Sequence, residues 1–188
     1  MRVFLFFVFF CACAFGYKDA FFIGGYGGLL DGTLEKSTKA DLESDSIKGV
    51  RLGWNNNMRS PFLGKVRWEF YYEQRDFTYD FGGAKKTEDG WQVGASVALG
   101  YNVDWFLTQE LVPYFKVGSG IGGFGDDYEN GSNLNLGVGV AFAFRLFELT
   151  IEARREFWQL KGYRFAFQAP FKNDGANDVF TAGLNFKF

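Results

Sequence analysis

Apolar and polar residues alternate one by one over long stretches of this chain. In the stretch 134–146, every even position from Leu134 to Leu146 is apolar, and the odd positions carry Asn, Gly, Ala and Arg. The last ten residues, 179–188, follow the same rule and end on Phe188. Successive side chains of a β-strand point to opposite faces, so a period of two predicts strands with one apolar face.

Eight such strands are predicted along the chain. They cover 20–30, 46–56, 63–77, 91–103, 112–124, 134–146, 148–157 and 179–188. Short connections are expected at 57–61, at 106–110 and at Phe147, and longer polar ones at 31–45, 78–90, 125–133 and 162–178. Short and long connections in alternation are typical of outer-membrane barrels, with short periplasmic turns and longer extracellular loops. The predicted fold is all-β: one eight-stranded, antiparallel, up-and-down transmembrane β-barrel with both termini in the periplasm.

The apolar faces indicate which way the barrel wall is turned. A soluble β-sandwich or lipocalin-like barrel would have this length too, but it would pack those faces inside. The interior of eight strands is only just wide enough to be filled by side chains, and the apolar faces hold too many large rings for it: Trp54, Trp68, Phe70, Trp91, Phe142, Phe144, Phe186 and Phe188. A chain that is 21% aromatic with a mean hydropathy of only -0.11 also fits strands that meet lipid at every second position. We therefore expect the rings to face lipid.

The opposite faces carry a set of charges that would point into the lumen. These are Arg51, Lys65, Arg67, Arg75, Lys116, Arg145 and Arg154, with Glu69, Glu73, Glu148, Glu152 and Glu156. Buried ions are tolerated only when they are paired and hydrogen-bonded, so we expect a network that plugs the lumen. The alternative is a conducting lumen, although open aqueous channels belong to much wider barrels. Arg155 is the main exception: it would face lipid, and we expect it near the outer interface or at a bulge, because at the midplane it would cost ~2–4 kcal/mol.

The first sixteen residues read as a secretory signal. Met1-Arg2 is a short positive start, Val3–Phe10 is wholly apolar, and the small residues that follow suit cleavage after Ala14 or Gly16. Residues 17–188 would then form a single barrel domain. Cleavage would remove Cys11 and Cys13, the only two cysteines of the sequence, so no disulfide is expected.

The composition argues against several classes of function. The 188-residue chain has no histidine, which is the commonest general base, so we expect no enzyme. Acidic neighbours such as Asp126 and Asp127 are more often solvated surface than a metal site, and glycine runs such as 24–28 lack the strand–helix context of a phosphate loop. No cofactor and no metal are expected. Without Arg2, 19 basic residues face 22 acidic ones, a balance that does not favour nucleic acid as a partner.

The whole pattern resembles the small eight-stranded bacterial outer-membrane proteins, namely the OmpX/Ail and opacity-protein group and the transmembrane domain of OmpA. The resemblance lies in the architecture and in the ending Phe186-Lys187-Phe188, since the last strand of such barrels ends in an aromatic residue that the assembly machinery recognises. It implies a place in the bacterial outer membrane and three kinds of partner: outer-membrane lipid with lipopolysaccharide, the barrel-assembly machinery, and a host or extracellular ligand at the loops. It thus implies a structural or adhesin-like role, and the inward charges leave a narrow porin-like channel as the alternative. The outer-membrane lipid A deacylase, palmitoyltransferase and protease families share the architecture, but they depend on a histidine.

Overall fold

The computed structural model describes residues 20–35, 41–57, 64–81, 84–105, 108–124, 129–160 and 175–188. The predicted signal segment 1–16 lies outside these residues. The described ranges contain nine strands: β1 (Ala20–Glu35), β2 (Asp41–Asn57), β3 (Lys65–Phe81), β4 (Ala84–Gly100), β5 (Val103–Trp105), β6 (Thr108–Phe124), β7 (Glu129–Ala143), β8 (Phe147–Leu160) and β9 (Gly175–Lys187). Within the described ranges, no helix is long and apolar enough to cross a membrane.

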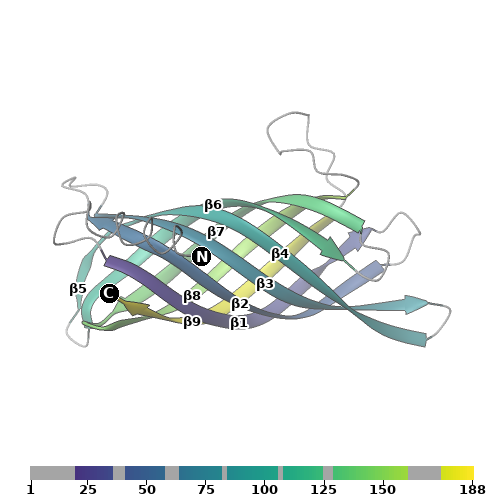
Figure 1. The fold of residues 1–188 in the computed structure, drawn as a ribbon, viewed down its shortest axis with the longest axis horizontal. Helices are drawn as coiled ribbons and strands as arrows, with labels where there is room; N and C mark the ends of the chain where they lie inside the picture. Colours follow the sequence, from purple (N-terminus) through teal and green to yellow (C-terminus); the bar gives the residue numbers. More distant parts are fainter. Residues whose placement is uncertain are drawn as a thin grey trace, which may run out of the picture.

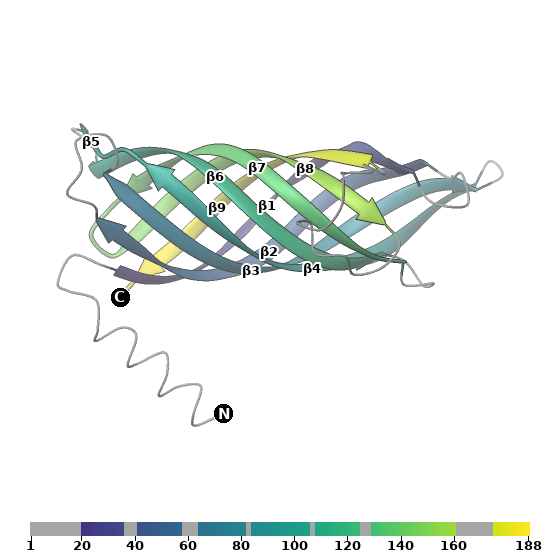
Figure 2. The same cartoon turned by 90° about the horizontal axis from the view of Figure 1, so that it is seen from above.

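Eight of these strands close into a barrel (Figures 1 and 2). All pairs are antiparallel; the order is β4-β3-β2-β1-β9-β8-β7-β6, and β4 pairs with β6 to complete the ring. The short β5 only adds to the edge of β6. The stagger of the closed barrel follows from the register of its strands. Starting at Ile23 of β1 and stepping from each residue to its partner on the next strand leads around the ring to Ala176 of β9. The partner of Ala176 on β1 is Thr33, ten residues further along that strand than the starting point. A stagger of ten residues over eight strands tilts the strands by about 40° from the barrel axis, as the oblique ribbons in Figure 1 show. The prediction of an eight-stranded antiparallel barrel is confirmed.

The two faces of the wall differ as the alternation predicts. In β9, Phe180 and Phe186 are 56% and 51% exposed, and Phe188, which directly follows the strand, is 77% exposed, whereas Thr181 and Asn185 are buried. The other strands follow, with these large apolar side chains exposed on the outer surface: Val50, Leu52, Trp68, Phe70, Phe115, Val117, Leu136, Val138, Leu149 and Ile151. Phe186 and Phe188, which the sequence suggests as an assembly signal, thus lie on the outer face.

The barrel has two distinct ends. At the turn end, β7 and β8 are joined by residues 144–146, and aromatic rings gather there in contact: Trp54 with Trp68 (6.1 Å between ring centroids), Phe21 with Phe188 (6.5 Å) and Phe144 with Phe147 (4.6 Å). At the opposite, hairpin end, β3 and β4 run out as a long two-stranded ribbon (Figure 1). The two ends of the barrel therefore differ in structure, so a membrane that the barrel spans would have the turn end on one side and the hairpin end on the other.

The segment 78–90 is not the loop that the sequence predicts. β3 continues to Phe81 and β4 begins at Ala84, so most of this segment is strand, and the hydroxyls of Thr78 and Thr87 lie 3.3 Å apart across the ribbon. Beyond the apolar wall neither face has to be lipophilic, so the period-two signal fades although the strands continue. The first predicted loop, 31–45, is shortened likewise, because β1 reaches Glu35 and β2 starts at Asp41.

Arg145 corrects one of the predicted lumen positions. β7 ends at Ala143, and a backbone hydrogen bond from Phe144 N–H to Phe147 C=O, 2.9 Å long, closes a tight turn with Arg145 and Leu146 at its tip. The Arg145 side chain is exposed. The alternation continues through this turn in the sequence, so the parity of position 145 did not reveal that the strand had ended.

Candidate functional site in the barrel lumen

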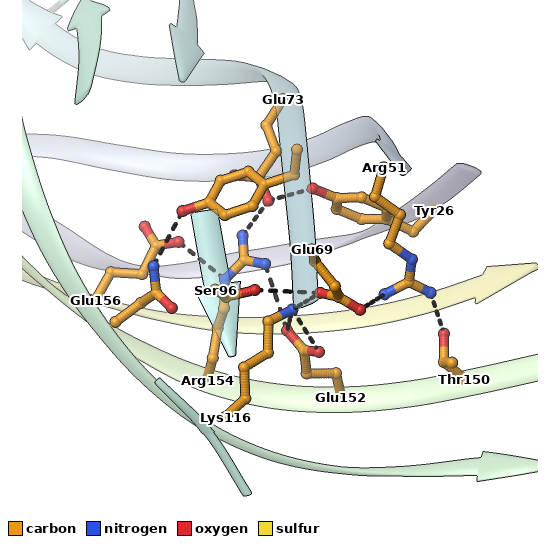
Figure 3. A network of polar contacts seen from close by, with 12 residues as sticks. Tyr26, Arg51, Glu69, Glu73, Ser96, Lys116, Thr150, Glu152, Arg154 and Glu156 are labelled. Atoms are coloured by element: carbon orange, nitrogen blue, oxygen red, sulfur yellow. Dashed lines mark hydrogen bonds and ion pairs between the residues drawn. The ribbon is translucent and has the colours of Figure 1, made fainter. Parts of the chain in front are cut away.

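The inward charges form a connected network inside the barrel, and Figure 3 shows the part of it around Glu69, Glu152 and Arg154. Among the described residues, five cations and five anions take part, each at most 5% exposed: Arg51, Arg67, Arg75, Lys116 and Arg154, with Glu69, Glu73, Glu148, Glu152 and Glu156. Their formal charges cancel. A burial this deep is tolerated because every carboxylate has a cation beside it.

Three ion pairs cross the whole lumen. They join β3 to β8: Arg67 to Glu148, Glu73 to Arg154, and Arg75 to Glu156 with Nη1 and Oε2 2.6 Å apart. In the closed ring β3 and β8 are separated by four steps in either direction, so they stand on opposite walls. Side chains from opposite walls meet at three successive levels, and the lumen is filled at each of them.

Between the Arg67–Glu148 pair and the Glu73–Arg154 pair, a lysine from another strand joins two carboxylates. The ammonium of Lys116, on β6, lies 2.6 Å from Glu69 Oε2 and 2.9 Å from Glu152 Oε2. Arg154 then connects Glu152 to the ion pairs nearer the hairpin end, with Nη1 3.4 Å from Glu152 Oε1 and Nε 2.9 Å from Glu156 Oε1. Positive and negative groups therefore alternate from Arg67 near the turn end to Arg75 near the hairpin end.

Two of the predicted cations, one inside the network and one outside it, lie at the margin of this chain of contacts. Arg51 is 3.8 Å from Glu69 and donates through Nε to Asn185 Oδ1 at 2.8 Å, with a further hydrogen bond to Thr150. Lys65 pairs with Glu110 at 3.0 Å, nearer the turn end. Except for Arg145, the structure thus places every predicted lumen charge inside the barrel.

Neutral side chains that the sequence reading did not single out complete the network. Tyr26 donates to Glu73 Oε1 at 2.6 Å, Tyr114 donates to Glu152 Oε2 at 3.1 Å, and Trp158 donates to Glu156 Oε2 at 3.1 Å. Trp158 has the same parity as Glu156 in β8, and that signal identifies it as inward. Aromatic rings with a polar atom suit this place, because they fill space and still satisfy a carboxylate.

Inward glycines make room for the tyrosine rings. A Cβ added at Gly139 would lie 2.5 Å from the Tyr114 ring, and one at Gly49 would lie 2.7 Å from the Tyr26 ring. These strand glycines therefore serve close packing inside a narrow barrel.

Gly139→Ala is expected to lower the free energy of unfolding by about 1–3 kcal/mol, because Tyr114 must move away from Glu152 or strain the wall. Gly25 is the matched control: it is an exposed strand glycine whose added Cβ would meet nothing closer than 3.7 Å, so Gly25→Ala should change stability little. Urea unfolding in lipid vesicles, followed by tryptophan fluorescence, measures both. Equal effects would show that the close contact at Gly139 does not matter.

Apolar layers lie at both ends of the network. Phe22 lies under the Arg67 guanidinium, 4.7 Å from its carbon, close to a cluster of Ala98, Val112, Tyr114 and Ala141. Leu30, Ile47 and Val179 form the corresponding cluster towards the hairpin end. The expectation that apolar residues of the strands face only lipid is thus too simple. A cavity between Lys65, Arg67 and Glu148 measures about 10 Å³, which is room for about one water molecule.

Comparisons with known proteins support the fold. No family model matches the sequence, and no curated protein matches it. Among solved structures, Neisserial surface protein A has a TM-score of 0.64 at 12% identity, covering 92% of this chain and 100% of that one. The outer membrane protein OprG from Pseudomonas aeruginosa (15% identity, 93% and 97% covered) and a major outer membrane protein from Thermus thermophilus (16% identity, 92% and 100% covered) each have a TM-score of 0.50. This chain has the fold of the small outer-membrane β-barrels.

Proposed function

We propose that this protein is an integral barrel of the bacterial outer membrane that acts at the cell surface, with a closed lumen that serves as a rigid support. The three ion pairs that join opposite walls carry this proposal. A lumen crossed at three levels by paired charges is suited to hold the wall in shape and poorly suited to pass solutes. The proposal includes no catalytic role, since the chain has no histidine and its buried carboxylates are held by cations.

The outer surface supports the membrane location. Exposed apolar side chains cover the wall, and aromatic rings gather at the turn end, as expected of an interfacial girdle. The turn end would face the periplasm and the hairpin end the outside. Membrane fractions should contain a form that migrates differently on gels before and after heating, whereas a soluble barrel would show no such shift and would be absent from the membrane fraction.

The β3–β4 ribbon is the described part that extends furthest towards the proposed outside (Figure 1). We propose that it takes part in binding a host or extracellular ligand, together with the predicted loop 162–178. Replacing 79–86 by Asn-Gly would close the ribbon directly above the Thr78–Thr87 pair with a two-residue turn.

The shortened ribbon is expected to keep the heat-shifted barrel and to lose most of the binding of protein-bearing vesicles to cultured host cells. Replacing Arg145-Leu146 by Asn-Gly makes a matched change at the turn end and should leave binding intact. Unchanged binding by the shortened ribbon would contradict its role.

A narrow channel is the second candidate, and one observation favours it. Towards the hairpin end, both amide atoms of Asn133 and of Asn177 are buried without a protein partner, and such groups are normally satisfied by water. If water fills the half of the lumen towards the hairpin end, the part of the lumen that is closed would be limited to the charged network. A channel predicts that vesicles bearing the protein release trapped potassium, whereas the closed support predicts that they retain it.

A further inference from the structure

One ion pair lies on the outside of the barrel, among side chains that face lipid. Arg155 of β8 and Asp178 of β9 are paired across neighbouring strands, with Nε and Oδ1 3.6 Å apart and side chains 59% and 47% exposed. The predicted lipid-facing orientation of Arg155 is therefore confirmed, and β8 carries it without a shift in register. A charge on this face needs a physical reason.

The position of Arg155 along the strand supplies part of the reason. It lies eight residues beyond Phe147, the first residue of β8, which corresponds to a rise of about 20 Å towards the hairpin end for a strand tilted by about 40°. The apolar band of such barrels is about 25 Å tall, and an arginine costs only ~0–1 kcal/mol near its border. Arg155 thus lies close to the level where lipid headgroups begin on the proposed outer side.

A groove of about 270 Å³ leads away from this pair along the wall. Ala153 lies two residues before Arg155 on the same face, and its register neighbours are Val138 on one side and Phe180 on the other. The small side chain of Ala153 leaves a depression between the larger side chains of Val138 and Phe180. Phe115, the register neighbour of Val138, also lines the groove. The groove therefore has one charged end, towards the hairpins, and an apolar body that runs towards the turn end.

That shape matches a lipid molecule with an anionic head. An arginine fork binds phosphate with two parallel hydrogen bonds. Asp178 Oδ1 lies 3.6 Å from Arg155 Nε, which is beyond hydrogen-bond length, so this oxygen does not occupy the Nε–H donor. A second copy of the barrel would cover the apolar body but would give Arg155 no anion that the structure identifies.

We propose that this groove binds one phosphate-bearing lipid of the outer leaflet, with its phosphate on Arg155 and an acyl chain over Ala153. The proposal rests on the membrane location argued above. The heat-dependent gel shift tests that location separately, so a correctly inserted barrel that fails to bind lipid would overturn only the lipid site.

The test uses the full purified chain in detergent and dilauroyl phosphatidic acid as the probe, with bound lipid counted by native mass spectrometry. One phosphatidic acid per chain is expected to survive, and neutral diacylglycerol of the same chain length is not. Arg155→Gln should weaken binding at least tenfold, and Lys48→Gln, which removes another exposed cation on the outer surface, should change it less than twofold. Equal losses in the two variants would overturn the site.

The groove itself is tested by filling it. Ala153→Phe should abolish binding of the lipid, whereas Ala95→Phe, at an exposed alanine elsewhere on the outer wall, should not; both must show the gel shift. Retained binding in Ala153→Phe, or equal competition by inorganic phosphate, would mean that Arg155 takes a free anion and that no lipid site exists. A dimer of the wild-type chain that Ala153→Phe dissociates would assign the face to a second copy and overturn the proposal.

Discussion

Replacing Arg154 by methionine is expected to lower the free energy of unfolding by about 3–5 kcal/mol, the cost of breaking a buried ion pair from one side. Arg154 is the shared cation of three buried carboxylates, Glu73, Glu152 and Glu156. Methionine keeps most of the side-chain bulk, so the effect reports on charge more than on a cavity. Urea unfolding of the protein in lipid vesicles, followed by tryptophan fluorescence, measures it.

The next residue along the chain is the matched control. Arg155 points to the other face, and its pair with Asp178 is half exposed. Arg155→Met should therefore change the free energy of unfolding by less than about 1 kcal/mol. Combining Arg154→Met with Glu73→Gln should recover part of the loss, because one uncompensated carboxylate is removed. Equal effects at positions 154 and 155 would contradict the assignment of the two faces.

Reversing a single charge of a cross-lumen pair is expected to have the largest effect of any substitution considered. Arg67→Glu would place a third carboxylate beside Glu69 and Glu148, which now share Arg67. We expect a loss above the ~3–5 kcal/mol of simple removal and mostly unfolded protein on refolding into vesicles. Glu148→Arg should be similarly damaging, since it would bring two arginines together.

The exchanged pair, Arg67→Glu with Glu148→Arg, should regain about 1–3 kcal/mol relative to the sum of the single changes. Full recovery is not expected, because Arg67 also donates to Asn55 and lies over Phe22. The fraction of heat-shifted barrel on a gel and the urea midpoint both report the recovery. Strictly additive losses would show that positions 67 and 148 do not meet across the lumen.

The faces of the strands could be predicted from the sequence because lipid imposes a period of two. Arg154 and Arg155 illustrate this: parity alone placed the first in the lumen and the second on the outer wall, as the structure has them. The same reasoning failed at Arg145, where a turn interrupts the strand without interrupting the alternation. It also missed the ribbon beyond Phe77, where no lipid faces either side.

Partners within the lumen could not be predicted, because they depend on the stagger of the closed barrel. Residues 67 and 148 meet across opposite walls only because the ring closes with a shift of ten residues, and no local pattern encodes that shift. For the same reason, nothing in the sequence singles out Lys116 as the cation shared by Glu69 and Glu152. The apolar layers around Phe22 and Val179 likewise depend on where the charged levels end.

The most direct test of a closed, paired lumen is the conductance of the refolded wild-type protein in planar lipid bilayers. Paired charges from opposite walls at three levels predict that insertion, verified by the heat-dependent gel shift, produces no steady current. A steady conductance that disappears when Arg67 or Glu152 is replaced would contradict the plug and establish a channel lined by the same residues.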